Sequence, residues 1–290
     1  MRDLVADADR LRALHVPGAP LLLANAWDPP TARLVEELGL AAVATSSGAV
    51  AVTAGYADGG HLPPDVAFAA VARVAAAVEL PVSADLEDGY GLGADELVER
   101  LLEAGACGCN LEDTDHRAGG GLVDAARQAD WLAQVKQAGR AAGVDLVLNA
   151  RVDVHLLADH LPREHLLGGP TGGAPDGQPG GGAPDGGRHD EARRRARRYR
   201  DAGADCVYPI GLADVEVTRA LAQEVGPINA LYRPSSHRLE APTLAELTGA
   251  RVSRISLGSG LLRVALARVR AAVQALQAGD DAQVWEGVGG

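Results

Sequence analysis

The 290-residue sequence has few aromatic residues, a single lysine and no long apolar run. Aromatic residues make up 3% of the chain and hydrophobic residues 47%, so the core must be built from Ala, Val and Leu. This composition suits helices packed on a Val/Leu-rich sheet. No apolar run approaches a membrane span, and residues 1–15 form an amphipathic helical pattern rather than a signal peptide. We therefore expect a soluble, cytoplasmic protein.

The sequence also lacks positive charge, with a formal net charge of −12. This balance argues against nucleic acid and anionic membranes as partners. The main basic run, residues 193–200, is interpreted as the solvated face of a helix rather than a binding patch.

Cysteine and lysine are too scarce to support several kinds of chemistry. Cys107, Cys109 and Cys206 all lie in predicted strands, and their odd number and spacing fit neither a disulfide framework nor a zinc site. We expect buried thiols. The single lysine, Lys136, falls within a helical pattern away from any strand end, which argues against a Schiff-base aldolase mechanism.

Short apolar strands alternate with amphipathic helices along the chain, as expected for parallel strands buried on both faces. Strands are predicted at 20–26, 41–47, 81–87, 108–113, 145–152, 206–211, 227–232 and 251–258. Helices are predicted at 31–38, 64–79, 95–104, 125–142, 191–202, 214–224, 243–248 and 260–277. Eight such units predict a single (β/α)₈ barrel, a TIM barrel spanning residues 1–290. A doubly wound sheet is the alternative, but no G-x-G-x-x-G follows the first strand.

One segment interrupts this alternation after the fifth strand. Residues 168–189 are mostly Gly, Pro, Ala and Asp, and cannot bury enough apolar surface to offset the entropy of ordering. We interpret them as a flexible insertion, a solvated spacer more readily than an active-site lid.

Carboxylates follow the predicted strands where each strand ends. Asp85 and Glu87 share a face in the run PVSADLEDGYG, and Glu112 ends the next strand. In a barrel of parallel strands these ends converge on one face, which is where the chemistry takes place. Crowded carboxylates repel unless a cation lies among them, and oxygen ligands without His or Cys favour Mg²⁺, with Mn²⁺ as the alternative.

Other polar groups end neighbouring strands. The turn at 45–49 (TSSGA) can present N–H groups to an oxyanion, although many loops contain Ser and Gly. Asp58 follows in the same loop and is equally consistent with a turn residue. Asn149 and Arg151 share a face, and Arg151 suits bidentate binding of a substrate carboxylate or phosphonate. The alternative for Arg151 is a structural ion pair. Ser259, at the start of the last helix, is expected to be an ordinary N-cap rather than part of an anion site.

These motifs resemble the isocitrate lyase/phosphoenolpyruvate mutase superfamily over residues 25–266. The segments that carry the resemblance are NAWDPPTARLVEELG, SSGAVAVTAGYADG, LPVSADLEDGYG, GACGCNLED, LVLNARVD, RYRDAGADCVYPIGL and ARVSRISLGSGLLRVAL. They run in family order and cover nearly the whole barrel.

The resemblance implies a role for each group. Asp85 would bind Mg²⁺ directly, while Asp58, Glu87 and Glu112 would hold its waters. The substrate would contact residues of several loops: Ser47, Gly48, Ala49, Trp27, Tyr90, Asn149 and Arg151. Candidates for the catalytic steps are Arg151, Glu112, His116 and Asp58. The resemblance also implies a dimer or tetramer in which the last helix is exchanged with, or packed on, a neighbouring subunit.

The loop after the fourth strand departs from the family. Isocitrate and methylisocitrate lyases carry K-[KR]-C-G-H there, whereas this chain has TDHRAGGG at 114–121, with neither Cys nor Lys. The lysine- and asparagine-containing loop of the phosphonate mutases is also missing, and so is their histidine at the end of strand six. His116 remains as a possible acid or base, with a solvated loop histidine as the alternative.

These observations favour a Mg²⁺-dependent lyase-type enzyme. It would act on a small 2-oxo or 2-hydroxy carboxylic acid through a metal-stabilised enolate, by C–C cleavage, decarboxylation or hydrolysis. The alternatives are a phosphonomutase or phosphonopyruvate hydrolase acting on a P–C bond, and a non-catalytic protein that binds a 2-oxo acid.

Overall fold

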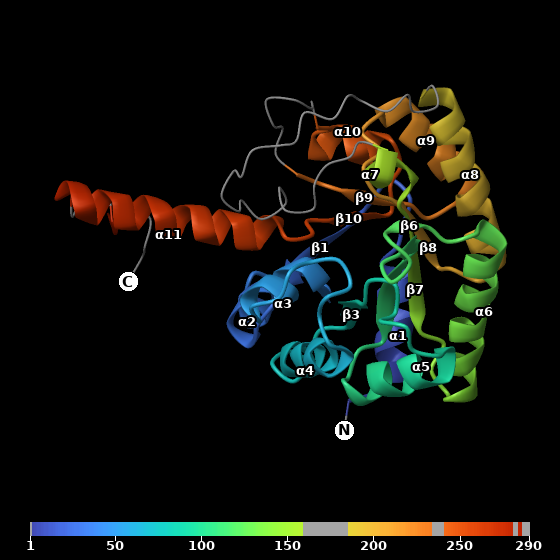
Figure 1. Ribbon diagram of the computed structural model, residues 1–290, viewed down its shortest axis with the longest axis horizontal. Helices are drawn as coiled ribbons and strands as arrows, with labels where there is room; N and C mark the ends of the chain where they lie inside the picture. The colour runs from blue at the N-terminus through green and yellow to red at the C-terminus, as the bar shows by residue number, and fades with distance from the viewer. Residues whose placement is uncertain (1, 159–184, 234–240, 281–283, 286–290) are drawn as a thin grey trace.

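Eight parallel strands form a nearly closed barrel, so the predicted α/β barrel is confirmed (Figure 1). The computed structural model describes residues 2–158, 185–233, 241–280 and 284–285. Within them the strands follow the order β8-β7-β4-β3-β2-β1-β10-β9. Their bounds are β1 (Leu21–Ala26), β2 (Val43–Thr45), β3 (Val82–Asp85), β4 (Gly108–Glu112), β7 (Val147–Val152), β8 (Cys206–Pro209), β9 (Asn229–Leu231) and β10 (Arg254–Ser256).

The two edge strands of this sheet meet and bring the barrel close to closure. Val207 of β8 forms a parallel bridge with Ile228, and its N–H donates to the Pro227 carbonyl at 3.0 Å. The pairing is shorter than elsewhere in the sheet, but it satisfies backbone groups that an open edge would leave exposed.

Helices follow the strands on the outside of the barrel (Figure 1). Their bounds lie within four residues of the predicted ones, except at the start of α8: α2 (Pro29–Glu37), α4 (Pro64–Ala75), α5 (Ala94–Glu103), α6 (Ala125–Ala141), α8 (Asp185–Asp201), α9 (Val215–Val225), α10 (Leu244–Gly249) and α11 (Gly260–Ala278). Helix α8 begins six residues earlier than predicted, so residues 185–189 of the expected flexible insertion are helical. The rest of that insertion, 168–184, lies outside the described residues.

Three short elements were missed by the sequence prediction. Helix α3 (Ser47–Thr53) occupies the segment predicted as a loop, because the Ser46 side chain caps it by accepting from the Ala49 N–H. The loop after β4 forms a small antiparallel hairpin of β5 (Thr114–Asp115) and β6 (Gly121–Leu122). Helix α7 (Val154–Ala158) follows β7 directly. All three are too short for a periodic apolar pattern.

The predicted N-terminal helix, α1 (Leu4–Ala13), closes the end of the barrel opposite the strands' carboxyl ends. Leu11 is fully enclosed and packs with Leu23, Cys107 and Val147 in a small apolar cluster. Its side chain approaches Gly108 so closely that an added Cβ there would lie 3.0 Å from it. Helix α1 therefore covers this end of the barrel.

The scarce residues lie where the sequence predicted them. All three cysteines are free and buried, and burial raises the pKa of each thiol to about 12. Lys136 is buried away from the strands' carboxyl ends, with its ammonium 2.6 Å from the Leu146 carbonyl oxygen and 2.9 Å from Asp205. It cannot serve as a Schiff-base lysine at the open end.

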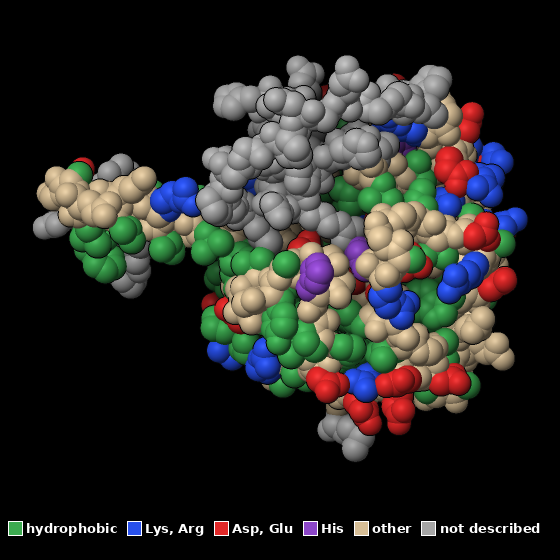
Figure 2. All heavy atoms as spheres, viewed as in Figure 1, with side chains coloured by type: hydrophobic (Ala, Val, Ile, Leu, Met, Phe, Trp, Pro, Cys, Tyr) green, Lys and Arg blue, Asp and Glu red, His purple; other side chains and the backbone are tan. Residues whose placement is uncertain are grey.

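Helix α11 extends away from the barrel and carries apolar side chains along its length (Figures 1 and 2). Leu266, Val269, Val273 and Leu276 are exposed, and their three- and four-residue spacing places them on one stripe. Among the described residues, no helix has the length and apolar character needed to cross a membrane.

Replacing Leu11 by Ala should lower the free energy of unfolding by about 2–5 kcal/mol, because it empties a fully enclosed site. The matched control is Leu38→Ala, at a leucine that is 70% exposed, and it should change stability by no more than about 0.5 kcal/mol. Urea unfolding followed by circular dichroism measures both. Equal effects of the two substitutions would contradict the role of α1 in closing the barrel.

Candidate active site

A cavity of about 410 Å³ opens at the carboxyl ends of the strands. This volume is that of a small-molecule site. Its lining includes residues from all eight barrel strands and from the start of α11. Of the predicted site residues it includes Ser47, Gly48, Asp58, Asp85, Glu112 and Arg151. The barrel thus gathers groups that are far apart in the sequence, as its geometry predicts.

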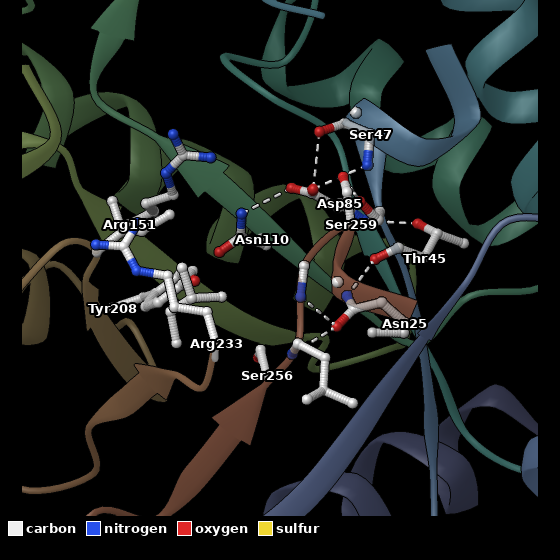
Figure 3. Close-up of a pocket in the computed structure, with 18 of the residues that line it drawn as sticks. Asn25, Thr45, Ser47, Asp85, Asn110, Arg151, Tyr208, Arg233, Ser256 and Ser259 are labelled. Atoms are coloured by element: carbon white, nitrogen blue, oxygen red, sulfur yellow. Dashed lines mark hydrogen bonds between the residues drawn. The ribbon is translucent and has the colours of Figure 1, made fainter. Parts of the chain in front are cut away.

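Asp85, at the end of β3, is held in a fixed orientation at this cavity (Figure 3). Its Oδ2 accepts hydrogen bonds from the Ser47 N–H at 2.9 Å and from the Ser47 hydroxyl at 2.8 Å. Its Oδ1 accepts from the Asn110 amide at 2.8 Å. Because Ser47 is the first residue of α3, the helix directs its positive end at the carboxylate.

Glu87 lies beside Asp85 but is almost completely enclosed, with 1% of its surface exposed. Its backbone adopts φ 50°, which turns the loop sharply after β3. One carboxylate oxygen accepts from the Gly60 N–H, and the other, Oε1, has no partner within the described chain. Burial, together with the charges of Glu112 and Asp58, raises the pKa of Glu87 to about 8. A cation among these acids would relieve this penalty.

Glu112, at the end of β4, forms a chain of close contacts with Arg151 and His116. One of its oxygens pairs with the Arg151 guanidinium and the other with Nε2 of His116. The His116 side chain is 4% exposed, and no Cβ would fit at Gly60 above it. The alternative of a solvated loop histidine was therefore wrong. His116 does not line the cavity itself, but it contacts Glu112, which does.

Arg151 is held from its other side by Asp153. The Arg151 Nε donates to Asp153 Oδ1 at 2.6 Å, and Nη2 donates to Oδ2 at 3.0 Å. Although burial opposes it, the charges of Asp153 and Glu112 raise the pKa of Arg151 well above its usual value. Arg151 therefore forms the structural ion pair that was the alternative, and it also lines the cavity, so substrate binding by Arg151 stays a prediction.

A buried network behind Asp153 joins the hairpin, β7 and α8. The Thr114 hydroxyl donates to Asp153 at 2.5 Å, and the Asp153 N–H donates to Asp113 at 2.8 Å. Asp113 in turn accepts from Arg195 at 2.9 Å and from the Tyr199 hydroxyl at 2.7 Å. The basic run at 193–200 was thus wrongly interpreted as wholly solvated, because Arg195 is buried at its centre.

The residues present fit a hard divalent cation held mainly through waters. Within the described residues, no three His, Cys, Asp or Glu side chains converge closely enough to hold a metal directly. Such convergence is not required if Asp85 is the one direct ligand and the acids around it hold the waters of the cation. The unpaired Glu87 Oε1 and the raised pKa of Glu87 are what an uncompensated carboxylate cluster produces.

Other predicted substrate contacts lie in different places. Gly48 lines the cavity, and a Cβ there would meet Asp58 Oδ2 at 2.9 Å. Ala49 and Asn149 are fully buried and do not line it, although the Asn149 amide supports Asn110 at 2.7 Å. The aromatic pair, Trp27 and Tyr90, packs against the apolar cluster around Val50 and Leu62 instead. Direct substrate contact by these four side chains is not supported.

Several cavity residues were missed from the sequence. Tyr208, Arg233 and Arg254 line the cavity, and Figure 3 shows Arg151 and Arg233 on the same side of it. Arg233 forms no ion pair with any residue that the structure describes. The sequence did contain a signal for Arg254, because a basic residue stands there within the apolar strand segment RVSRISL. Ser259 was expected to be the N-cap of α11, but its side chain makes no capping hydrogen bond. Its hydroxyl instead lies 3.0 Å from the Ser46 hydroxyl in the cavity wall.

Comparisons with known proteins place the chain in a family. A family model described as phosphoenolpyruvate phosphomutase matches residues 11–277. An uncharacterized protein of Mycobacterium tuberculosis is 30% identical over 247 residues, which are 85% of this chain and 80% of that protein. The 2-methylisocitrate lyase of Halalkalibacterium halodurans is 26% identical over 226 residues, which are 75% of this chain and 64% of that enzyme.

A solved structure supports the same assignment. A Burkholderia cenocepacia protein provisionally described as a phosphonomutase is 34% identical, with a TM-score of 0.77 over 92% of this chain and 99% of that one. Family and structural neighbours alike are lyase and mutase enzymes. The chain therefore belongs to the phosphoenolpyruvate phosphomutase family and is an enzyme of the isocitrate lyase/phosphoenolpyruvate mutase superfamily.

Proposed function

We propose that the protein is a Mg²⁺-dependent lyase-type enzyme that acts on a small 2-oxo or 2-hydroxy carboxylic acid. The observation that carries this proposal is the fixed carboxylate of Asp85 facing the cavity, with Asp58, Glu87 and Glu112 around it. An acidic site of this kind needs a cation, and oxygen donors select Mg²⁺ or Mn²⁺.

Asp85 would hold the cation directly, and Asp58, Glu87 and Glu112 would hold its waters. A bound Mg²⁺ supplies Lewis acidity, which polarises a 2-oxo acid's carbonyl and favours enolate formation. The chain's own groups orient the substrate. Gly48, in the first turn of α3, and Arg151 both line the cavity, where they would contact oxygens of the substrate.

Glu112 and His116 form the proton-holding pair of the site. The ring of His116 is enclosed and contacts Glu112, which lines the cavity. We infer that His116 sets the protonation and orientation of Glu112 and does not touch the substrate. The buried network from Thr114 to Tyr199 fixes Arg151 from behind, so substrate binding does not require this arginine to be ordered anew.

C–C bond chemistry is favoured over P–C chemistry by the composition of the cavity. The hairpin loop carries neither the cysteine and lysine of the isocitrate lyases nor the lysine of the phosphonate mutases, and the end of β8 lacks the histidine of the mutases. The likeness to 2-methylisocitrate lyase supports C–C cleavage, decarboxylation or hydrolysis. The match to the phosphoenolpyruvate phosphomutase model keeps a P–C reaction as the second candidate.

We also propose that the chain forms a dimer or tetramer through α11. Its stripe of Leu266, Val269, Val273 and Leu276 is exposed in the part of the chain that the structure describes, and apolar side chains gather along the projecting helix (Figure 2). Exposed apolar surface of this regularity is typical of a helix that packs on another protein surface. A neighbouring subunit of the same kind fits, because the first turn of α11 lines the cavity.

Asp85→Asn should abolish Mg²⁺-dependent turnover, with a loss of about a hundredfold or more, because the neutral amide cannot hold the cation. The assay is proton and phosphorus NMR of a panel of 2-oxo acids, 2-hydroxy acids, phosphonopyruvate and phosphoenolpyruvate with Mg²⁺. Asp95→Asn, at an exposed position on α5, is the matched control and should leave turnover unchanged. Undiminished Mg²⁺ binding and turnover in the Asp85 variant would reject the proposal. A new phosphorus resonance would favour the P–C alternative.

Mg²⁺ affinity should rise with pH up to about pH 8. Glu87 holds a proton below its pKa of about 8, and only the ionised carboxylate favours the cation. Each unit of pH below that value should weaken binding by up to about tenfold. Calorimetric titrations at several pH values measure this slope. Glu87→Gln should bind Mg²⁺ more weakly and with a flatter pH dependence. An unchanged slope in that variant would assign the proton to another group.

Val269→Asp should shift the protein to a smaller species, because it places a charge in the apolar stripe of α11. Gln274→Asp adds the same charge to an exposed position off that stripe and should not. Light scattering coupled to size-exclusion chromatography reports the mass of each variant. A monomeric unsubstituted protein, or a Val269 variant of unchanged mass, would contradict assembly through α11.

A further inference from the structure

The barrel interior contains a buried cation without a counter-ion. Arg254 is the first residue of β10, is 3% exposed, and lines the cavity. It forms no ion pair with any residue that the structure describes, although the described chain pairs most of its other buried basic groups. Burial lowers the pKa of Arg254, the opposite of what its carboxylate partners do for Arg151.

The hydrogen bonds of Arg254 use only part of its donor capacity. Nε donates to the Ser256 hydroxyl at 3.3 Å and Nη1 to the Ser83 hydroxyl at 3.5 Å, both at the long end of the range. The third nitrogen, Nη2, makes no hydrogen bond to a described residue, and it is not among the buried polar atoms that the protein fully encloses. It therefore faces the cavity.

A second open donor faces the same space. Tyr208, on β8, is 6% exposed and lines the cavity. Its hydroxyl makes no hydrogen bond within the described chain, and it too is absent from the fully enclosed atoms. Tyr208 lies beside Arg151 in the parallel register of β7 and β8, and it lines the same cavity as Arg254. Both groups offer protons to an acceptor that the protein does not supply.

The register of β3 fixes how far this pair lies from the proposed metal ligand. Ser83, which contacts Arg254, and Asp85 are two residues apart on the same face of the strand. Two residues along a strand span about 7 Å. Arg254 thus lies one layer below Asp85, at the floor of a cavity whose mouth carries the acids.

An uncompensated buried guanidinium is costly, and it is usually retained only where something else pairs with it. Asp85 is the one carboxylate among the charges that act most strongly on Arg254, and its oxygens are already engaged by Ser47 and Asn110. The missing partner is therefore an anion that enters through the cavity. A carboxylate suits it, because a planar guanidinium matches two carboxylate oxygens.

We propose that Arg254 and Tyr208 form a subsite for a second carboxylate of the substrate. This inference rests on the proposed function, in which the first carboxylate and the 2-oxo or 2-hydroxy group bind near Asp85 and Ser47. The subsite makes the enzyme selective for diacids over monoacids of the same chain length.

The test compares matched ligand pairs with Mg²⁺ present: 2-oxoglutarate against 2-oxopentanoate, and 2-oxoadipate against 2-oxohexanoate. Isothermal titration calorimetry should show the diacid of at least one pair binding about 10- to 100-fold more tightly, the value of a charge-assisted hydrogen bond. Arg254→Gln should reduce the diacid's affinity to that of the monoacid and leave the monoacid unchanged. Tyr208→Phe should reduce the preference by a smaller factor and serves as the test if the Arg254 variant does not fold. A preference that survives both substitutions overturns the proposal.

A metal-free arm separates this inference from the proposed function. Succinate in the presence of a chelator should raise the melting temperature of the unsubstituted protein but not that of Arg254→Gln. If Mg²⁺ has no effect on binding while succinate still acts through Arg254, the proposed function fails and the subsite stands. If succinate stabilises both proteins equally or neither, and no diacid is preferred, the subsite is rejected. In a buffer without carboxylates, the Arg254→Gln variant should have a melting temperature no lower than that of the unsubstituted protein, since the substitution removes an uncompensated charge. If Arg254 had a purely structural role, the same substitution would lower the melting temperature.

Discussion

The site depends on the parallel register of β3, β4 and β7. That register places Asp85 beside Asn110, and Asn110 beside Asn149, so that each amide supports the next group in the row. One layer higher, the same register sets Glu112 beside Arg151. A slip of one residue in any of these strands would turn the whole row away from the cavity. Asp85 and Arg151 are thus both fixed at the cavity by strand register.

The mouth of the cavity carries uncompensated negative charge, and its floor carries uncompensated positive charge. At the mouth, crowded acids raise the pKa of Glu87 and leave one of its oxygens without a partner. At the floor, Arg254 is a cation without a carboxylate. Arg151 lies between these regions and is already neutralised by Glu112 and Asp153. A ligand that brings a cation to one end and an anion to the other would compensate both, which is the property expected of a metal-bound diacid.

The fold was predictable from the sequence because its signals are local and repeated. Each strand is a short apolar run and each helix a periodic one, and eight repetitions leave few architectures. The acids at strand ends were predictable for the same reason. The short elements were not: α3 opens with small and β-branched residues, and it is helical because Ser46 caps it and its residues are buried. His116 could not be placed, because its enclosure depends on Gly60, in the loop after β2.

The sequence by itself thus determined the barrel, the order of its acids and the family to which the chain belongs. Only the tertiary structure decided which groups face one another across the barrel. In the sequence, the run that contains Arg195 is explained as a basic helix, and the run that contains Arg254 is explained as an apolar strand. The first is buried against Asp113, and the second lies in the barrel with no carboxylate partner among the described residues. The physical reason is that the cost of a buried charge depends on its neighbours in space, and strand closure brings those neighbours from distant parts of the chain.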